Sequence, residues 1–170
     1  MIVNDHLPAI AATPGSVLPR NILFEYVDKV MSFIDPSVIK PFTVVLDAGS
    51  GMAGLVAPLL FDQLPCKTTK LCFDIDGTFP NHEANPLIEE NRRDITARVI
   101  ADKADIGIAW DGDADRCFFL DCAGEFVAGD FVTALLAEAF LLKVPKGATI
   151  IYDLRASHAV KDTTARYGGR

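Results

Sequence analysis

The sequence of 170 residues is poor in cysteine and has no long apolar run. Its four cysteines form no C-x-x-C pair, so neither a zinc knuckle nor a dithiol redox motif is expected. Cys72 and Cys117 lie inside apolar runs, where we expect small buried side chains. No apolar stretch reaches the about 18 residues of a membrane span, and the first ten residues lack the basic and long apolar regions of a signal peptide. These absences predict a protein of the reducing cytoplasm with no membrane partner.

Positive charge is also scarce. The chain has 16 Lys and Arg against 23 Asp and Glu, a formal net charge of −7. A general nucleic-acid binder normally carries a basic patch, so no nucleic-acid partner is expected. Half of the residues are hydrophobic and 23% are charged, which is the composition of a globular rather than a disordered protein. The length suits one well-packed domain with short extensions.

Negative charge, by contrast, is concentrated in the loop Asp111-Gly112-Asp113-Ala114-Asp115-Arg116. Apolar runs at 105–110 and 117–120 flank this loop, so one buried strand is expected to lead into it and another to leave it. An extended loop would place its three carboxylates on the same side. Two unit charges ~5 Å apart repel by about 3 kcal/mol at an effective dielectric near 20, so these carboxylates need full solvation or a cation. An all-oxygen ligand set favours a hard divalent ion, Mg²⁺ before Ca²⁺ or Mn²⁺.

The loop does not fit an EF-hand, which also begins D-x-D-x-D. Arg116 stands at the sixth position, where an EF-hand needs Gly, and Cys122 stands at the twelfth, where it needs Glu. The flanking runs also have the character of strands rather than helices.

Apolar periodicity predicts strands and helices in alternation along the chain. Strands are expected at 42–46, 67–73, 105–110, 117–120, 125–127 and 148–152, and helices at 22–34, from the glycine turn to 64, at 91–103, at 130–143 and from 158 toward 167. Asp130 and Ser157 are expected to cap the last two helices. This order predicts an α/β fold, a three-layer α/β/α domain with a mixed, mostly parallel sheet of about four strands.

A glycine-rich turn, Gly49-Ser50-Gly51-Met52-Ala53-Gly54, follows the first strand. With Asp74 at the end of the second strand it matches the dinucleotide-binding fingerprint, in which glycines approach a pyrophosphate. The alternative is that the glycines let a helix begin close against the sheet. A dinucleotide site would leave the triple-aspartate loop unexplained.

A second motif, Asp74-Ile75-Asp76-Gly77-Thr78, resembles the nucleophile motif of haloacid-dehalogenase-like phosphatases. In those enzymes the first Asp, here Asp74, attacks phosphorus beside Mg²⁺. The residues that follow, 79–86, hold two prolines and no helical pattern, unlike the segment expected after such a nucleophile. A Mg²⁺-dependent phosphatase and a purely structural domain stay open as alternatives.

Three segments together resemble the α-D-phosphohexomutases, the superfamily of phosphoglucomutase and phosphomannomutase. They are Asp47–Gly54 (DAGSGMAG), Gly77–Pro86 (GTFPNHEANP) and Asp111–Arg116 (DGDADR), in the order and approximate spacing of that family. The resemblance covers roughly residues 26–170. Ala114 stands where the family often has a second glycine in the acidic loop, a departure that leaves all three carboxylates in place.

The resemblance implies a four-domain enzyme of which this chain is the second domain with short pieces on either side. Residues 1–20 would be a linker or disordered lead, 21–40 an interdomain helix, 41–153 the metal-binding domain, and 154–170 the start of the following domain. Such an enzyme interconverts hexose 1-phosphate and hexose 6-phosphate, of mannose or glucose, through an enzyme phosphoserine and a bisphosphorylated sugar. It would bind its hexose phosphate with domains that this chain lacks.

The resemblance also implies roles for individual residues. Asp111, Asp113 and Asp115 would hold Mg²⁺ together with the serine phosphate, and Arg116 would contact the phosphoserine or the transferred phosphoryl group. Arg155 would face the active-site cleft, or else would be a surface arginine near a helix start.

Other residues near these motifs are expected to have structural roles. Asn81 and His82 would buttress their loop. Ser157, in Ala156-Ser157-His158, echoes the family's phosphoserine segment but follows the metal loop instead of preceding it, so it is not expected to be the nucleophile. Without a phosphoryl carrier, the chain alone is expected to be inactive as a mutase.

Overall fold

The structure, a computed structural model, describes residues 13 and 15–170. Most of the predicted lead, residues 1–20, therefore lies outside the described residues. The helices are α1 (Leu23–Met31), η2 (Pro36–Val38), α2 (Ala53–Phe61), η3 (Glu89–Arg92), α3 (Arg93–Asp102), α4 (Gly129–Leu141) and α5 (His158–Arg166). The strands are β1 (Thr43–Asp47), β2 (Lys67–Leu71), β3 (Ile106–Trp110), β4 (Cys117–Leu120) and β5 (Phe126–Val127). In these residues no helix has the length and apolar character needed to cross a membrane.

The strands form one mixed sheet in the order β2-β1-β3-β4-β5. β1 pairs in parallel with β2 and β3, whereas β4 pairs antiparallel with β3 and β5. The predicted α/β class is confirmed, with five strands instead of about four. Parallel pairing stops at β3 because the short loop 111–116 can only reverse the chain, and a parallel connection needs a long crossover.

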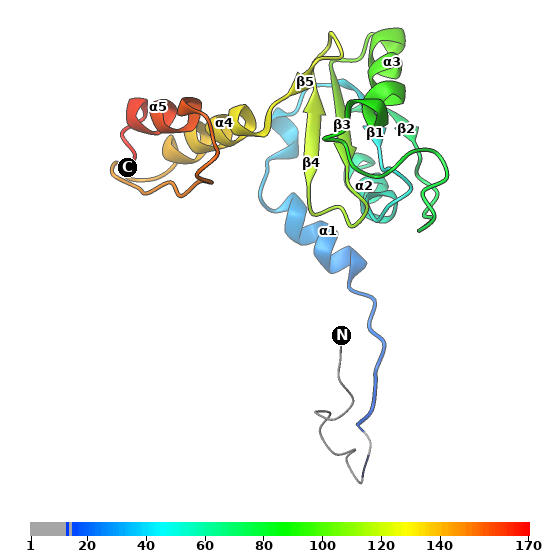
Figure 1. Cartoon of the computed structure of the whole chain (residues 1–170). Helices are drawn as coiled ribbons and strands as arrows, with labels where there is room; N and C mark the ends of the chain where they lie inside the picture. The colour runs from blue at the N-terminus through cyan, green and yellow to red at the C-terminus, as the bar shows by residue number, and fades with distance from the viewer. Residues whose placement is uncertain (1–12, 14) are drawn as a thin grey trace, which may run out of the picture.

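Helices cover both faces of the sheet, as the predicted three-layer arrangement requires (Figure 1). From β1 the chain crosses to β2 through α2, and then back past β1 to β3 through α3. Right-handed crossovers in opposite directions place α2 and α3 on opposite faces. Consecutive β1 residues Val44, Val45 and Leu46 are at most 2% exposed, so both faces of this strand are covered. The best-defined core lies under α3, where Ile95 and Val99 pack with residues of β1, β3 and β4.

The strand order creates a switch point between β1 and β3, where the two crossovers diverge. The carboxyl ends of these neighbouring strands lead directly into the turn 48–51 and the loop 111–116. In open α/β sheets such a switch point leaves a crevice at the carboxyl ends of the strands, and ligands bind there.

α4 and α5 pack against each other and form a helical unit to one side of the sheet (Figure 1). The predicted strand 148–152 is wrong: these residues lie in this unit and join no strand of the sheet. Their main chain bonds instead to the end of the chain. The Ile150 N–H donates to the Arg170 carbonyl at 2.8 Å, and the Arg170 N–H donates to the Ala148 carbonyl at 2.9 Å.

The sequence predicts the cap of α5 correctly but not the cap of α4. Ser157 caps α5 as predicted, since its Oγ accepts the Ala159 N–H at 3.3 Å. Asp130 is not the cap of α4, because α4 begins at Gly129 and Ala128 occupies the cap position. The Asp130 carboxylate instead accepts the Ser157 N–H at 3.3 Å and so connects the two helices. The predicted domain boundary after residue 153 cuts through this helical unit and stays a prediction.

Two further sequence expectations fail for local reasons. The second strand ends at Leu71 instead of Phe73, because Cys72 has a φ of 54°, a left-handed conformation that strands do not contain. Cys117 is exposed instead of buried, since it opens β4 at the rim of the acidic loop.

A substitution at Gly54 tests how closely α2 packs on the loop after β2. A Cβ on Gly54 would lie 2.5 Å from the Phe73 carbonyl oxygen. We expect Gly54→Ala to lower the free energy of unfolding by about 1–3 kcal/mol, because backbone must move to admit the methyl group. Urea denaturation measures this change.

Gly129→Ala is the matched control, since Gly129 is also helical and a Cβ there meets no atom within 4 Å. It should leave stability unchanged or raise it by up to about 1 kcal/mol, the ordinary helix-propensity gain. Equal effects of the two substitutions would contradict the close approach at Gly54.

Candidate metal site

The acidic loop brings its three carboxylates together. One oxygen from each of Asp111, Asp113 and Asp115 lies within 4.8 Å of the other two. Asp111 is buried, at 1% exposed, whereas Asp113 and Asp115 are exposed. The result is an all-oxygen donor set, open to solvent on one side, at the carboxyl end of β3. These donors fit a hard divalent cation such as Mg²⁺.

Arg116 compensates the buried carboxylate of Asp111. Its backbone N–H donates to Oδ1 of Asp111 at 3.1 Å, and its Nε donates to Oδ2. The same Nε lies 3.5 Å from an Asp115 carboxylate oxygen. The hydrogen bond to Asp111 raises the pKa of Arg116 above its ordinary value. Arg116 therefore offsets part of the repulsion among the three carboxylates.

Ala114 gives the loop its turn. Its φ is 61°, and its N–H donates to the Asp111 carbonyl at 3.1 Å. The left-handed conformation costs a residue with a Cβ roughly 1–2 kcal/mol, whereas glycine adopts it freely. This strain gives a physical reason for the glycine that the resemblance leads one to expect here.

The glycine-rich turn after β1 packs directly against the backbone of the acidic loop. The Met52 N–H donates to the Gly112 carbonyl at 2.9 Å. A Cβ on Gly51 would lie 2.5 Å from that same oxygen. Gly51 and Gly54 therefore need to be glycine for backbone packing alone, which supports the scaffold interpretation of this motif over a dinucleotide site.

The motif Asp74–Thr78 forms a turn that rests on the same glycine-rich segment. The Asp76 carboxylate accepts the Thr78 N–H at 2.9 Å and its hydroxyl at 2.8 Å, and these bonds lower the pKa of Asp76. The Asp76 N–H in turn donates to the Ser50 carbonyl at 2.9 Å. Asp76 thus acts as a turn-forming side chain.

A second cluster, which the sequence did not reveal, joins Asp47, Cys72 and His82. His82 Nε2 lies 3.1 Å from an Asp47 carboxylate oxygen and 3.8 Å from the Cys72 sulfur, and Nδ1 lies 2.9 Å from the Glu83 carbonyl oxygen. Burial raises the pKa of Asp47 and raises that of the Cys72 thiol to about 11. Both ring nitrogens of His82 are engaged, so the cluster is a satisfied polar network. The sequence did contain one sign that Asp47 is unusual, because this acidic residue ends a run that is predicted to be a buried strand.

Arg155 lies in the connection between α4 and α5, within the helical unit, and not in the acidic loop. Its Nε donates to an Asp153 carboxylate oxygen at 3.0 Å, and its side chain is 90% exposed. The predicted role of Arg155 in an active-site cleft stays a prediction.

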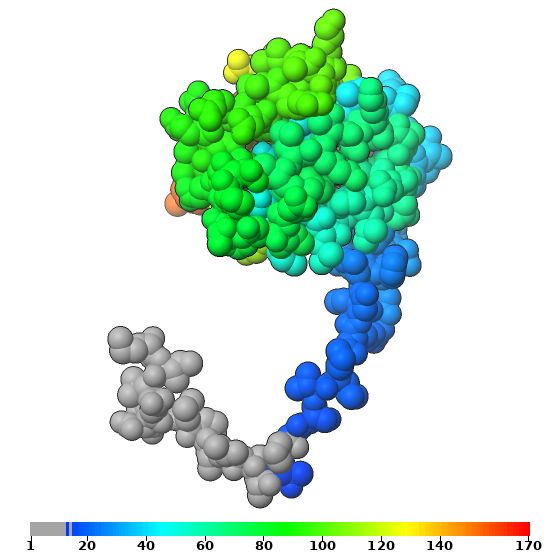
Figure 2. Space-filling view, turned by 90° about the vertical axis from the view of Figure 1, so that its right-hand side faces the viewer, coloured from blue at the N-terminus to red at the C-terminus, as the bar shows by residue number. Residues whose placement is uncertain are grey.

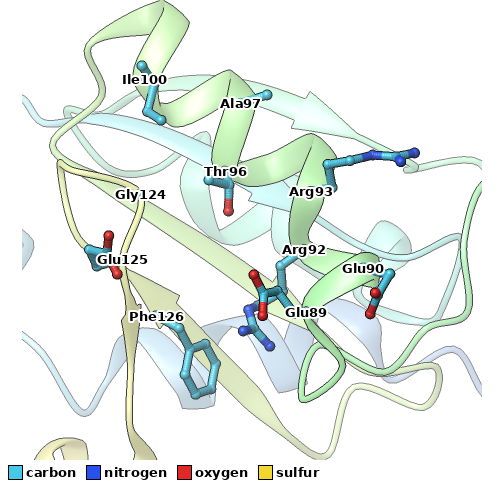
Figure 3. Close-up of a pocket in the computed structure, with 10 residues that line it drawn as sticks. All are labelled: Glu89, Glu90, Arg92, Arg93, Thr96, Ala97, Ile100, Gly124, Glu125 and Phe126. Carbon is cyan, nitrogen blue, oxygen red and sulfur yellow. The ribbon is translucent and has the colours of Figure 1, made fainter.

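A cavity of about 780 Å³ lies between α3 and the β4–β5 turn (Figure 3), and no residue of the acidic loop lines it. Arg92 points toward Phe126 there, with its guanidinium carbon 4.2 Å from the ring centroid, whereas Arg93 points away. None of the residues predicted to act in catalysis or metal binding lines this cavity.

A smaller cavity of about 190 Å³ borders the acidic loop and is lined by Trp110, Asp113 and Ala114, together with residues of α1 and α2. Trp110 is the single tryptophan of the chain.

With this geometry in place, comparison with known proteins gives a consistent answer. The family model for phosphoglucomutase/phosphomannomutase, alpha/beta/alpha domain II, matches residues 24–124, more than half of the chain. The chain belongs to this family. It is a phosphohexomutase domain, and the resemblance stated from three sequence segments is confirmed.

Relatives of this phosphohexomutase domain are much longer proteins. A phosphomannomutase of Vibrio cholerae is 44% identical over 160 residues, which cover 91% of this chain and 34% of the relative. A phosphomannomutase/phosphoglucomutase of Pseudomonas aeruginosa is 37% identical over 161 residues, which cover 95% of this chain and 34% of the relative. A crystal structure of a phosphoglucomutase/phosphomannomutase family protein of Burkholderia thailandensis superimposes with a TM-score of 0.82 at 36% identity, over 88% of this chain and 32% of that one. The chain thus spans about a third of the length of these proteins.

The strain at Ala114 predicts a stabilising substitution in the acidic loop. We expect Ala114→Gly to raise the free energy of unfolding by up to about 1 kcal/mol, because relief of the left-handed strain exceeds the added flexibility of the unfolded chain. Urea denaturation without divalent cations measures the effect.

Ala123→Gly, in the β4–β5 turn, is the control, since its φ is not positive. It should lower stability by up to about 1 kcal/mol. A loss of stability in both variants would contradict strain at Ala114.

Proposed function

We propose that this phosphohexomutase domain is the metal-binding part of an isomerase that interconverts hexose 1-phosphate and hexose 6-phosphate, with mannose or glucose as the sugar. The observation that carries the proposal is the convergence of three carboxylates and Arg116 at the switch point of the sheet. The printed names of the relatives, phosphomannomutase and phosphomannomutase/phosphoglucomutase, support the sugar assignment. Phosphoryl transfer in such an enzyme proceeds through a serine that this chain does not supply, and through a bisphosphorylated sugar.

Asp111, Asp113 and Asp115 would hold the Mg²⁺ ion. When bound, Mg²⁺ neutralises charge that is spread over the phosphoryl oxygens during transfer. The two exposed carboxylates remain accessible to an ion, and in residues 15–170 the Asp113 carboxylate makes no hydrogen bond within the chain. Because three carboxylates complete only part of an octahedral shell, Mg²⁺ binding to this chain alone should be weak.

Arg116 would contact the phosphoserine or the transferred phosphoryl group. Its Nε donates to Asp111, while its two Nη groups donate no hydrogen bond to the residues that the structure describes. The side chain is 54% exposed. A guanidinium fixed at one edge and open at the other offers forked donors to a phosphoryl group beside the metal.

The remaining length of the enzyme would cover apolar surface on this chain. Large apolar side chains on α1 and α4 are exposed, among them Phe24 at 69%, Phe131 at 60% and Leu135 at 64%. Burial of such surfaces stabilises interdomain contacts. Residues 21–40 and 154–170 would connect to neighbouring domains, with Arg155 near the shared cleft. All four cysteines are free, which is consistent with a cytoplasmic protein.

Metal binding tests the role of the acidic loop directly. We expect Asp113→Ala to weaken binding of Mg²⁺ or Mn²⁺ by at least about 10-fold, since it removes one charged ligand. The fold should persist, because the Asp113 side chain is exposed. Calorimetric titration, together with the fluorescence of Trp110 beside the loop, measures the affinity.

Asp162→Ala is the matched control, an exposed carboxylate on α5 outside the loop. It should bind the cations as the unmodified chain does. Identical binding heats for Asp113→Ala and the unmodified chain would count against the site.

The chain by itself should not interconvert hexose phosphates, because it carries no phosphoryl donor. We expect incubation with mannose 1-phosphate or glucose 1-phosphate and Mg²⁺ to give no 6-phosphate above background in a coupled assay. The phosphomannomutase of Vibrio cholerae serves as the positive control. Turnover by the 170-residue chain that is lost in Asp113→Ala would overturn this expectation.

A further inference from the structure

We infer that Phe79 and His82 are positioning residues for the acidic loop, which they hold in the geometry that a cation requires. Both lie on the segment 72–84 between β2 and η3. In Figure 2 this segment lies on the face turned toward the viewer, in its blue-green and green part. The inference rests on the proposed cation binding and assigns the segment a task that a loop connection alone would not have.

The first observation is that Gly112 is clamped from two sides. On one side the Met52 N–H donates to the Gly112 carbonyl at 2.9 Å. On the other side a Cβ on Gly112 would lie 3.1 Å from Phe79 Cζ and 3.7 Å from Ala84 Cβ. Gly112 separates two of the proposed ligands, Asp111 and Asp113. A shift of Gly112 therefore changes the distance between their carboxylates.

The second observation is the anchor that His82 provides for this segment. The Glu83 carbonyl can only accept, so the 2.9 Å contact requires a proton on Nδ1 of His82. The 3.1 Å contact from Nε2 to an Asp47 carboxylate oxygen is a second hydrogen bond of the same ring. Asp47 is 2% exposed, and its other oxygen accepts the Gly49 N–H at 2.9 Å. His82 thus ties the segment to the turn that supports Gly112.

The third observation is that Ser50 interlocks the two segments. Its N–H donates to the Cys72 carbonyl at 2.7 Å, and its carbonyl accepts the Asp76 N–H at 2.9 Å. Its hydroxyl oxygen accepts the Asn81 amide at 3.2 Å. With a φ of 56°, Ser50 holds a left-handed conformation that these contacts maintain. Hydrogen bonds of Ser50 therefore join the turn and the segment into one body beside the acidic loop.

Cation affinity should depend on this body because Mg²⁺ tolerates little error in ligand geometry. Its ligands lie at about 2.0–2.1 Å in near-ideal octahedral arrangement. Residues that orient metal ligands without touching the metal typically change metal affinity by about 10–100-fold when they are replaced.

The test compares Mn²⁺ affinity in folded variants, with Mn²⁺ as the probe and Trp110 fluorescence and calorimetry as readouts. We expect Phe79→Ala and His82→Leu each to raise the Mn²⁺ dissociation constant by at least about 10-fold. His82→Gln should restore most of the affinity, because its amide can donate to Asp47 from about the position of Nε2. Every titration is made below the unfolding temperature of each variant, so a loss of stability alone does not change the affinity of the folded fraction.

Glu83→Gln is the matched control, since His82 uses only the main-chain carbonyl of Glu83. Phe79→Ala keeps the test decisive if His82→Leu fails to fold. If the unmodified chain binds Mn²⁺ and Asp113→Ala does not, yet Phe79→Ala binds as the unmodified chain does, the positioning role is overturned and the metal site stands. If the unmodified chain itself binds no Mn²⁺, the proposed metal site is overturned first.

Discussion

The structure depends on a close backbone approach at the carboxyl ends of β1 and β3. Met52 bonds to the Gly112 carbonyl at 2.9 Å, and only a glycine at position 51 leaves room for that contact. Because β1 and β3 are adjacent parallel strands, the turn after one and the loop after the other are forced into the same space. The acidic loop therefore packs on a turn whose position is fixed by the sheet.

The buried and the exposed carboxylates near this turn differ in how their charge is compensated. Asp111 is buried and paired with Arg116, while Asp113 and Asp115 remain exposed. Asp47, a buried carboxylate of β1, is compensated separately by His82. The protein therefore neutralises within its own chain the carboxylates that it buries. The two that it leaves open carry the excess charge that a cation would balance.

The sequence predicts most of the sheet and the acidic loop, because both are encoded by local patterns. Apolar runs marked β1, β3 and β4 to within a residue or so, and the three aspartates are close neighbours in the chain. The strand 148–152 failed because an apolar run does not say which partner it will have. The cluster of Asp47, Cys72 and His82 was missed because its members come from three separate segments. The strand order, the left-handed conformation of Cys72 and the course of the segment that follows it bring them together.

The strand order also has a consequence for how the site is assembled. The carboxylates lie within five residues of one another, so even an unfolded chain can offer them to an ion loosely. Their supports, by contrast, come from residues about the turn 48–51 and the segment 72–84, and closing such long loops costs entropy before any contact repays it. A cation that binds the finished geometry more tightly than the loose one stabilises the folded state over the unfolded state. In this fold, ion binding and the completion of both crossovers are therefore thermodynamically coupled.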